Sequence, residues 1–193
     1  MSTLETLPER EFSAGMAEVI KYGMIYSKDF YAYISSNKSK LKNLEKKSLK
    51  ETIKKCCAIK ADIVSKDEKE LSIREILNFG HTIGHALEAA SEFRCLHGEC
   101  VAMGMLAAVH ISISRGIFKK KDMDPFKELL AFFSLPLKAR GLSAEKVYSR
   151  LLHDKKTRNN KIRFILADGI GKYERVSDVD EDMIKEAIAS VLE

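Results

Sequence analysis

The segment REILNFGHTIGHALEAA carries four polar side chains at spacings of four, three and four residues: Arg74, Asn78, His81 and His85. If the segment is one continuous helix, these side chains share a single face. Two histidines four residues apart can both bind a metal ion, as they do in zinc proteases. In those proteases a glutamate follows the first histidine, whereas this chain has Thr82. The spacing therefore indicates a metal site but not a protease; an exposed polar face with incidental histidines is the alternative interpretation.

Two glycines, Gly80 and Gly84, flank His81 in this segment. Each lowers helix stability by up to about 1 kcal/mol relative to alanine. A helix with a purely structural role has no evident need for that loss. We therefore expect another backbone or a ligand to approach this helix closely.

Two further residues complete a candidate metal site. His97 opens the segment HGECVAMGM, at the start of the next expected helix. Glu18 lies in the apolar segment AGMAEVIKYGMI, where a buried charge needs a partner. Lys21 could be that partner as an ordinary helix pair worth about 0.2–0.5 kcal/mol, but a metal would satisfy Glu18 better. A catalytic zinc takes three protein ligands and keeps one open position, which suits Glu18, His81 and His97.

A rival constellation is the pattern Cys95-x-His97-x2-Cys100, which resembles half of a structural zinc knuckle. A structural zinc site is normally closed by four ligands. The remaining cysteines, Cys56 and Cys57, are neighbours in an expected helix, so their side chains diverge. We interpret the cysteines as small buried apolar residues.

Composition favours one cytosolic domain. The chain has 193 residues, 45% of them hydrophobic, which is enough for a core of its own. Its apolar stretches fall short of the roughly 20 residues of a membrane span, and we expect neither a secretory signal nor disulfides. The net charge of +5 suits an anionic substrate. Nucleic-acid binding is a weaker alternative, because no aromatic residues are interleaved with the basic runs.

Apolar periodicity predicts a mainly α-helical fold. A change to alternating residues predicts a small hairpin over 162–176, around Asp168-Gly169-Ile170-Gly171. The glycines never form the G-x-G-x-x-G fingerprint of a dinucleotide-binding turn, so most of any nucleotide site is expected outside this chain. Helices are expected near 9–25, 28–36, 45–65, 73–91, 98–115, 122–134, 143–153 and 179–192.

Five motifs resemble, in order and spacing, the C-terminal domain of the 3-dehydroquinate synthase family: LPEREFSAGMAEVIKYG, KDEKE, LNFGHTIGHALE, HGECVAMGM, and DKK before a hairpin. The resemblance covers essentially the whole chain. It implies one metal- and substrate-binding domain over 1–193, with the N-terminal NAD-binding domain absent from this chain. Sugar-phosphate cyclases that make deoxy-scyllo-inosose or valiolone-type rings share the metal motif and are the nearest alternatives.

The resemblance also implies roles for individual residues. Glu18, His81 and His97 would hold zinc or cobalt. The substrate's carboxylate, hydroxyls and phosphate would be contacted by Lys21, Lys60, Arg74 and Asn78, with His85 and either Lys155 or Lys156 at the phosphate. The strip Thr3, Leu4, Glu5 and Thr6 would touch NAD. Three positions depart from the usual family pattern, namely Ser72, Cys100 and the pair Asn159-Asn160, and none of them removes a ligand.

The implied activity is that of a carbon–oxygen lyase of the shikimate pathway, which leads to chorismate and the aromatic amino acids. It converts 3-deoxy-D-arabino-heptulosonate 7-phosphate into 3-dehydroquinate and phosphate, with zinc and NAD as cofactors. The resemblance further implies an NAD-binding domain in cis or in trans and a homodimer in the full enzyme. A binding module that keeps the fold but performs no chemistry is the other function class left open.

Overall fold

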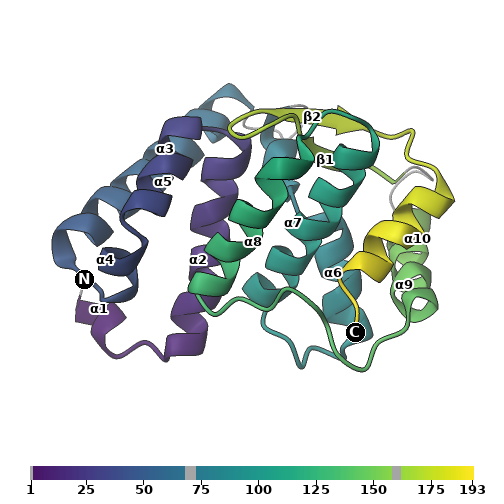
Figure 1. The fold of residues 1–193 in the computed structure, drawn as a ribbon, viewed down its shortest axis with the longest axis horizontal. Helices are drawn as coiled ribbons and strands as arrows, with labels where there is room; N and C mark the ends of the chain where they lie inside the picture. Colours follow the sequence, from purple (N-terminus) through teal and green to yellow (C-terminus); the bar gives the residue numbers. More distant parts are fainter. Residues whose placement is uncertain (1, 68–72, 158–161) are drawn as a thin grey trace.

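The computed structural model describes residues 2–67, 73–157 and 162–193, with only the backbone described for Ser2, Ile73 and residues 154–157 (Figure 1). The described part is mainly α-helical with one hairpin, which confirms the predicted class. Within these ranges, each helix is too short or too polar to cross a membrane. The elements are α1 (Ser2–Glu5), α2 (Glu9–Ile25), α3 (Lys28–Ser36), α4 (Lys38–Lys42), α5 (Lys46–Lys66), the 3-10 helix η1 (Ile73–Asn78), α6 (His81–Ala90), α7 (His97–Ser114), the 3-10 helix η2 (Lys120–Asp122), α8 (Met123–Phe132), α9 (Ala144–Thr157), β1 (Phe164–Ala167), β2 (Tyr173–Val176) and α10 (Glu181–Ser190).

One helix that the sequence predicts as continuous is interrupted in the structure. The segment expected to be helical over 73–91 is divided into η1 and α6. The break lies at Gly80, whose φ of 79° is left-handed and therefore incompatible with a continuing α-helix. Arg74 and Asn78 thus belong to η1, while His81 and His85 belong to α6, and the four side chains do not share one helix face.

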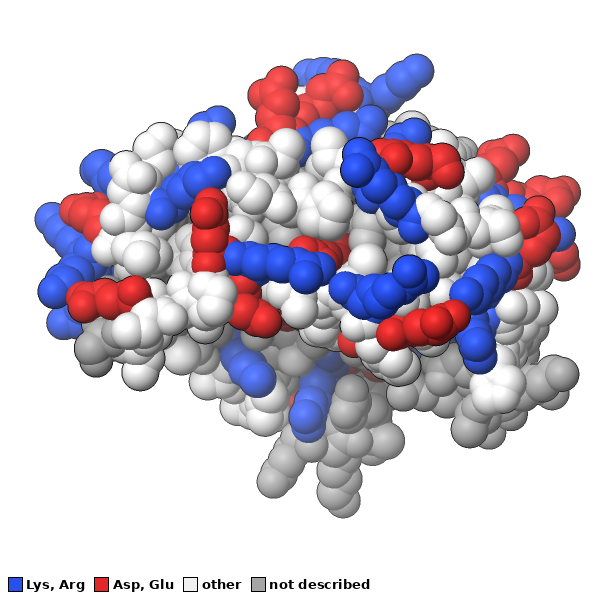
Figure 2. Space-filling model, turned by 90° about the horizontal axis from the view of Figure 1, so that it is seen from below, with Lys and Arg blue, Asp and Glu red and all other residues white. Residues whose placement is uncertain are grey.

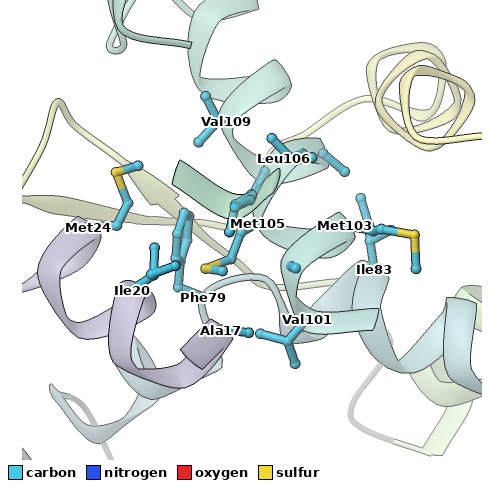
Figure 3. Packing of buried hydrophobic residues seen from close by; sticks show 14 of the residues in the cluster. Ala17, Ile20, Met24, Phe79, Ile83, Val101, Met103, Met105, Leu106 and Val109 are labelled. Carbon is cyan, nitrogen blue, oxygen red and sulfur yellow. The ribbon is translucent and has the colours of Figure 1, made fainter. Parts of the chain in front are cut away.

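Helix α7 runs through the middle of the molecule and is buried on nearly every side (Figure 1). Its sequence is apolar almost without interruption, as expected for a helix surrounded by other elements. Helices α2, α6, α8 and α10 and strand β1 all contact it. Figure 3 shows the centre of this core, where Val101, Met105 and Val109 of α7 lie among Ile20 of α2 and Phe79.

The hairpin closes one end of the helical core. Strand β1 is buried along its whole length and pairs antiparallel with β2, from Phe164 opposite Val176 to Ala167 opposite Tyr173. At the tip, the amide of Gly171 donates to the carbonyl oxygen of Met24 at 2.7 Å. A Cβ on Gly171 would lie 2.4 Å from the amide nitrogen of Lys28. The tip therefore requires glycine to reach the junction of α2 and α3.

Glycines let three helices meet backbone to backbone. A Cβ added to Gly104 of α7 would lie 1.9 Å from the carbonyl oxygen of Gly80, at the entrance to α6. A Cβ added to Gly98 of α7 would lie 2.1 Å from the carbonyl oxygen of Ala14 in α2. At Gly84 of α6 an added Cβ would lie 3.1 Å from the carbonyl oxygen of Cys100. The close approach expected at Gly80 and Gly84 is confirmed, and the approaching backbone is that of α7.

The substitution Gly104→Ala should lower the free energy of unfolding by about 3 kcal/mol, because the new methyl group meets a fixed carbonyl in a filled interior. Gly15→Ala is the matched control: Gly15 lies within a helix, is exposed, and has no atom within 4 Å of an added Cβ. It should raise stability by about 0.5–1 kcal/mol. Urea unfolding followed by circular dichroism measures both, and equal stability of the two variants would contradict the packing argument.

Candidate metal centre

Three helices bring the predicted metal ligands together. Glu18 lies in α2, His81 is the first residue of α6, and His97 is the first residue of α7. The Oε1 atom of Glu18 lies 3.5 Å from Nε2 of His81 and 4.0 Å from Nε2 of His97. The two imidazole centroids are 5.2 Å apart. Residues remote in sequence therefore direct electron-pair donor atoms toward one small region.

The opposite ring nitrogens of both histidines face oxygen atoms. Nδ1 of His81 lies 3.1 Å from the carbonyl oxygen of Phe79, and Nδ1 of His97 lies 3.2 Å from Oε2 of Glu88. A carbonyl oxygen can only accept a hydrogen bond, so in the neutral ring Nδ1 of His81 carries the proton. The Nε2 atom of His81 then presents a lone pair toward Oε1 of Glu18, which the Nε2 atom of His97 also faces.

The two carboxylate oxygens of Glu18 have different surroundings. Its Oε2 accepts an ion-paired hydrogen bond from Nζ of Lys21 at 2.5 Å. Its Oε1 is buried and has no hydrogen-bond donor within the described ranges. A buried carboxylate oxygen that has no donor and faces two imidazole nitrogens is unfavourable unless a cation lies between them. Two imidazole nitrogens and one carboxylate oxygen fit a zinc-like ion with an open position.

Lys21 is buried, with only 3% of its surface exposed. Its Nζ donates to the carbonyl oxygen of Leu77 at 2.7 Å as well as to Glu18. Burial lowers the pKa of Lys21, the charge of Glu18 opposes that shift, and the charge of Lys60 adds to it. The helix pair considered as an alternative partner for Glu18 is therefore present, yet it leaves Oε1 available for a metal. Lys60 itself is exposed on α5.

His85 lies one turn beyond His81 and joins the same cluster. Its ring centroid is 5.3 Å from that of His81 and 5.8 Å from that of His97. The ligand atoms of these three histidines all lie within 4.8 Å of one another, so they form a second possible donor set that shares two members with the first. The unsatisfied Oε1 favours the set that contains Glu18, because a cation there removes a buried unpaired group.

The short helix η1 places Arg74 and Asn78 on the chain that leads directly into α6. The amide of Arg74 donates to Oδ2 of Asp67 at 3.0 Å, and Asp67 is buried. Sequence reasoning missed Asp67 as a residue that positions Arg74, although it lies within the motif KDEKE. Arg74 and Asn78 are both half-buried.

A second carboxylate missed from the sequence is Glu75, whose side chain is 15% exposed. Its Oε1 accepts from Arg163 at 2.6 Å and its Oε2 accepts from Arg175 at 3.3 Å. Thr82 of α6 donates in turn to the carbonyl oxygen of Arg163 at 3.0 Å. These bonds join η1 and the start of α6 to the hairpin. No motif signalled them, because the partners are remote in sequence.

Several predicted positions lie apart from this centre or beyond what is described. Thr3, Leu4 and Glu5 belong to α1, and Glu5 pairs with Lys46 of α5 at 3.4 Å. Lys155 and Lys156 belong to α9, but their side chains lie outside the described part. Ser72 and the pair Asn159-Asn160 also lie outside the described residues.

The cysteines follow the packing interpretation only in part. Cys100 is fully buried in the core, and burial raises the pKa of its thiol. Cys56 is half-buried, and burial raises its pKa to about 12. Cys57 is exposed, which corrects the expectation that it is buried. Within the described ranges, the three histidines form a group whose ligand atoms all lie within 4.8 Å of one another, and no cysteine belongs to it.

On the face that Figure 2 shows, surface charge is mixed rather than concentrated. Figure 2 shows basic and acidic side chains interspersed over the face seen from below Figure 1. Exposed cations are also paired: Arg140 lies 2.8 Å from Glu193, and Lys146 lies 3.3 Å from Glu92. Mixed signs are typical of a solvated surface and differ from the basic stripe of a nucleic-acid-binding face.

The metal-free chain should lose stability as the pH falls from about 6.5 to about 4. Burial lowers the pKa of His81 to about 4, from an ordinary value of 6.5. Between these values the unfolded chain binds more protons than the folded chain, so acid favours unfolding. Urea unfolding in the presence of a chelator, at about pH 7 and about pH 4.5, measures this effect. The free energy of unfolding should fall more between the two pH values in the wild type than in His81→Gln. Equal losses would contradict the assignment to His81.

Comparison with known proteins identifies the family. The family model described as 3-dehydroquinate synthase C-terminal matches residues 15–157. The 3-dehydroquinate synthase of Acetivibrio thermocellus is 43% identical over 99% of this chain and 53% of the relative. That of Campylobacter fetus is 43% identical over 94% of this chain and 51% of the relative. The chain thus spans about half the length of the curated relatives it matches.

Solved structures show the same fold. A 2-epi-5-epi-valiolone synthase from Streptomyces hygroscopicus, solved with NAD+ and Zn2+, matches 96% of this chain and 52% of its own, with a TM-score of 0.87 and 20% identity. A 2-deoxy-scyllo-inosose synthase, solved with carbaglucose-6-phosphate, NAD+ and Co2+, matches 95% of this chain and 53% of its own, with a TM-score of 0.80 and 28% identity. Because the family model matches residues 15–157 and the relatives are 43% identical over nearly the whole chain, the chain belongs to the 3-dehydroquinate synthase family, of which it matches the C-terminal domain.

Proposed function

We propose that this chain is the metal- and substrate-binding half of a 3-dehydroquinate synthase. The reaction would convert 3-deoxy-D-arabino-heptulosonate 7-phosphate into 3-dehydroquinate and phosphate, in the shikimate pathway. The observation that carries the proposal is the convergence of Glu18 Oε1 with the Nε2 atoms of His81 and His97, in a chain 43% identical to such synthases. The half of the relatives' length that this chain does not match would supply most of the NAD site, with the strip Thr3, Leu4, Glu5 and Thr6 at its margin.

The level of sequence identity favours this synthase over the related cyclases. The two cyclase structures share the fold at 20% and 28% identity. The 3-dehydroquinate synthases reach 43% over nearly the whole chain. The substrate differs as well, because the heptulosonate phosphate carries a carboxylate that a neutral sugar phosphate lacks. Arg74, Lys21 and Lys60 would place basic groups beside the metal centre for that carboxylate.

In this proposal the protein's residues bind and orient the substrate around a zinc or cobalt ion held by Glu18, His81 and His97. The ion would act as a Lewis acid toward a substrate hydroxyl while NAD takes up and later returns a hydride. Lys21 orients Glu18 through its ion pair with Oε2. Arg74 and Asn78, fixed by η1, would hold the carboxylate end and the hydroxyls.

Phosphate elimination needs the proton next to the oxidised carbon to leave. The substrate's phosphate can accept that proton if basic groups hold the phosphate in place. His85, which is exposed and lies beside His81, would donate to the phosphate. Lys155 or Lys156 would complete the phosphate site, because charge-assisted bonds to phosphate are short and strong.

The purified chain should bind a single zinc ion, and His81→Ala should lose it. Removing His81 takes away one of three converging donors and leaves an incomplete coordination shell. Cys95→Ser is the control, because Cys95 belongs to the rival knuckle pattern and should leave the zinc content unchanged. Metal analysis by mass spectrometry after dialysis measures both. Zinc lost on Cys95→Ser and kept on His81→Ala would establish the knuckle instead.

Reconstitution tests the activity itself. The chain alone should release no phosphate from the heptulosonate phosphate. Mixed with NAD and the separately expressed N-terminal half of the Acetivibrio thermocellus relative, it should release phosphate.

Arg74→Ala in this mixture should reduce kcat/KM by an amount equivalent to about 2–5 kcal/mol, because a charged substrate group loses its partner. Its zinc content should be unchanged.

Arg140→Ala is the matched control for Arg74→Ala, because Arg140 is an exposed arginine paired with Glu193 near the C-terminus. It should retain full activity in the reconstituted enzyme. Phosphate release by the chain alone would refute the half-enzyme proposal. Preference for a neutral sugar phosphate would favour one of the related cyclases. A mixture that binds zinc, NAD and the heptulosonate phosphate but releases no phosphate would indicate a binding module.

A further inference from the structure

We propose that Glu88 is a positioning residue of the metal centre, which accepts the Nδ1 proton of His97 and so directs the Nε2 lone pair of His97 toward the metal. This inference rests on the proposed function, because it takes His97 as a ligand. Glu88 lies in α6, three residues after His85. Its role would be indirect, since it acts on the metal through the imidazole of His97.

The contact itself is specific. Oε2 of Glu88 lies 3.2 Å from Nδ1 of His97, and the Glu88 side chain is 21% exposed. On the other side of the same ring, Nε2 lies 4.0 Å from Oε1 of Glu18. The imidazole of His97 therefore lies between two carboxylates, one at each nitrogen. A carboxylate cannot donate, so the proton of the neutral ring belongs at only one of the two positions.

The two carboxylates differ in what surrounds them. Glu18 belongs to the set of donors that fits a cation, together with His81. Glu88 contacts the ring from outside that set, as a carboxylate does in the carboxylate–histidine–metal arrangement, where it fixes the tautomer and raises the basicity of the ligand. The proton is therefore assigned to the Nδ1 side, facing Glu88, and the lone pair to the Nε2 side, facing Glu18.

His97 needs such a partner more than His81 does. The His81 side chain is 13% exposed, and its Nδ1 is held by the carbonyl oxygen of Phe79. The His97 side chain is 47% exposed. A half-exposed imidazole is free to rotate and to exchange its proton between the two nitrogens through water. The contact with Glu88 supplies the restraint that burial supplies to His81.

The backbone of His97 is fixed by different residues. Oε2 of Glu99 accepts the amide of Leu96 at 2.9 Å, which caps the first turn of α7. Arg10 of α2 holds the same carboxylate through Nε at 2.7 Å. The position of His97 at the start of α7 therefore does not depend on Glu88. Removal of the Glu88 carboxylate should release the ring while the helix keeps its place.

The direct test is the tautomer of His97 in the metal-free chain. Long-range 1H–15N NMR spectra of the 15N-labelled protein, at about pH 8 where an ordinary histidine is neutral, distinguish a protonated Nδ1 from a protonated Nε2. The wild type should show His97 with Nδ1 protonated. Glu88→Ala and Glu88→Gln should shift His97 toward the Nε2-protonated form while His81 remains unchanged. Glu92→Gln is the control, because Glu92 pairs with Lys146 rather than with a histidine.

Metal affinity supplies the second readout. Competition with a chromogenic chelator should show zinc binding weakened about 10–100-fold in Glu88→Ala and Glu88→Gln, and unchanged in Glu92→Gln. Circular dichroism should show that all variants remain folded. An unchanged tautomer in both Glu88 variants, or a wild-type His97 protonated on Nε2, would overturn the inference. If the Glu88 variants shift the tautomer but the wild type binds no zinc, Glu88 remains the partner of His97 and the proposed function is refuted.

Discussion

The structure depends on the contact of α7 with α2 and α6, where the backbones touch directly. Gly98 meets Ala14 of α2, and Gly104 meets Gly80 at the entrance to α6, at distances that admit no side chain. Glu18 lies one turn beyond Ala14, His97 directly precedes Gly98, and His81 directly follows Gly80. The contacts that pack the core are therefore the ones that set the separation of the candidate ligands. Any larger residue at these glycines would both strain the core and move donor atoms apart.

The break between η1 and α6 serves the candidate site directly. In a continuous helix the carbonyl of Phe79 would accept the amide four residues later. Here the first bond of α6 runs from the amide of Gly84 to the carbonyl of Gly80, and the Phe79 carbonyl accepts Nδ1 of His81 instead. The left-handed Gly80 thus frees the acceptor that selects the tautomer of His81. The same break leaves Arg74 and Asn78 on a separate short helix, which Asp67 and Glu75 hold in place.

The centre gathers polar groups whose arrangement costs free energy in the absence of a cation. Glu18 Oε1 is buried without a donor in the described part of the chain, and burial lowers the pKa of His81, so protons do not readily fill the site. Lys21, also buried, neutralises one carboxylate oxygen and leaves the other. The apolar core around α7 offsets these costs by burying large side chains such as Phe79 and Met105. A stable core that tolerates an unfavourable polar site is a common feature of binding and catalytic centres.

The sequence by itself determined the mainly helical class, the hairpin, the family, and the glutamate and histidines that form the centre, because periodicity and motif spacing are local properties of the chain. It did not determine that the helix expected over 73–91 is broken. The apolar spacing continues across Gly80, whereas its left-handed φ and its close contact with α7 are visible only in the folded chain. Glu88, Asp67 and Glu75 could be recognised only after folding, because a carboxylate acquires its role from the group it faces. Tertiary structure also decided that Lys21 holds one oxygen of Glu18 while the other faces two histidines, because that geometry requires α2, α6 and α7 to meet at one point.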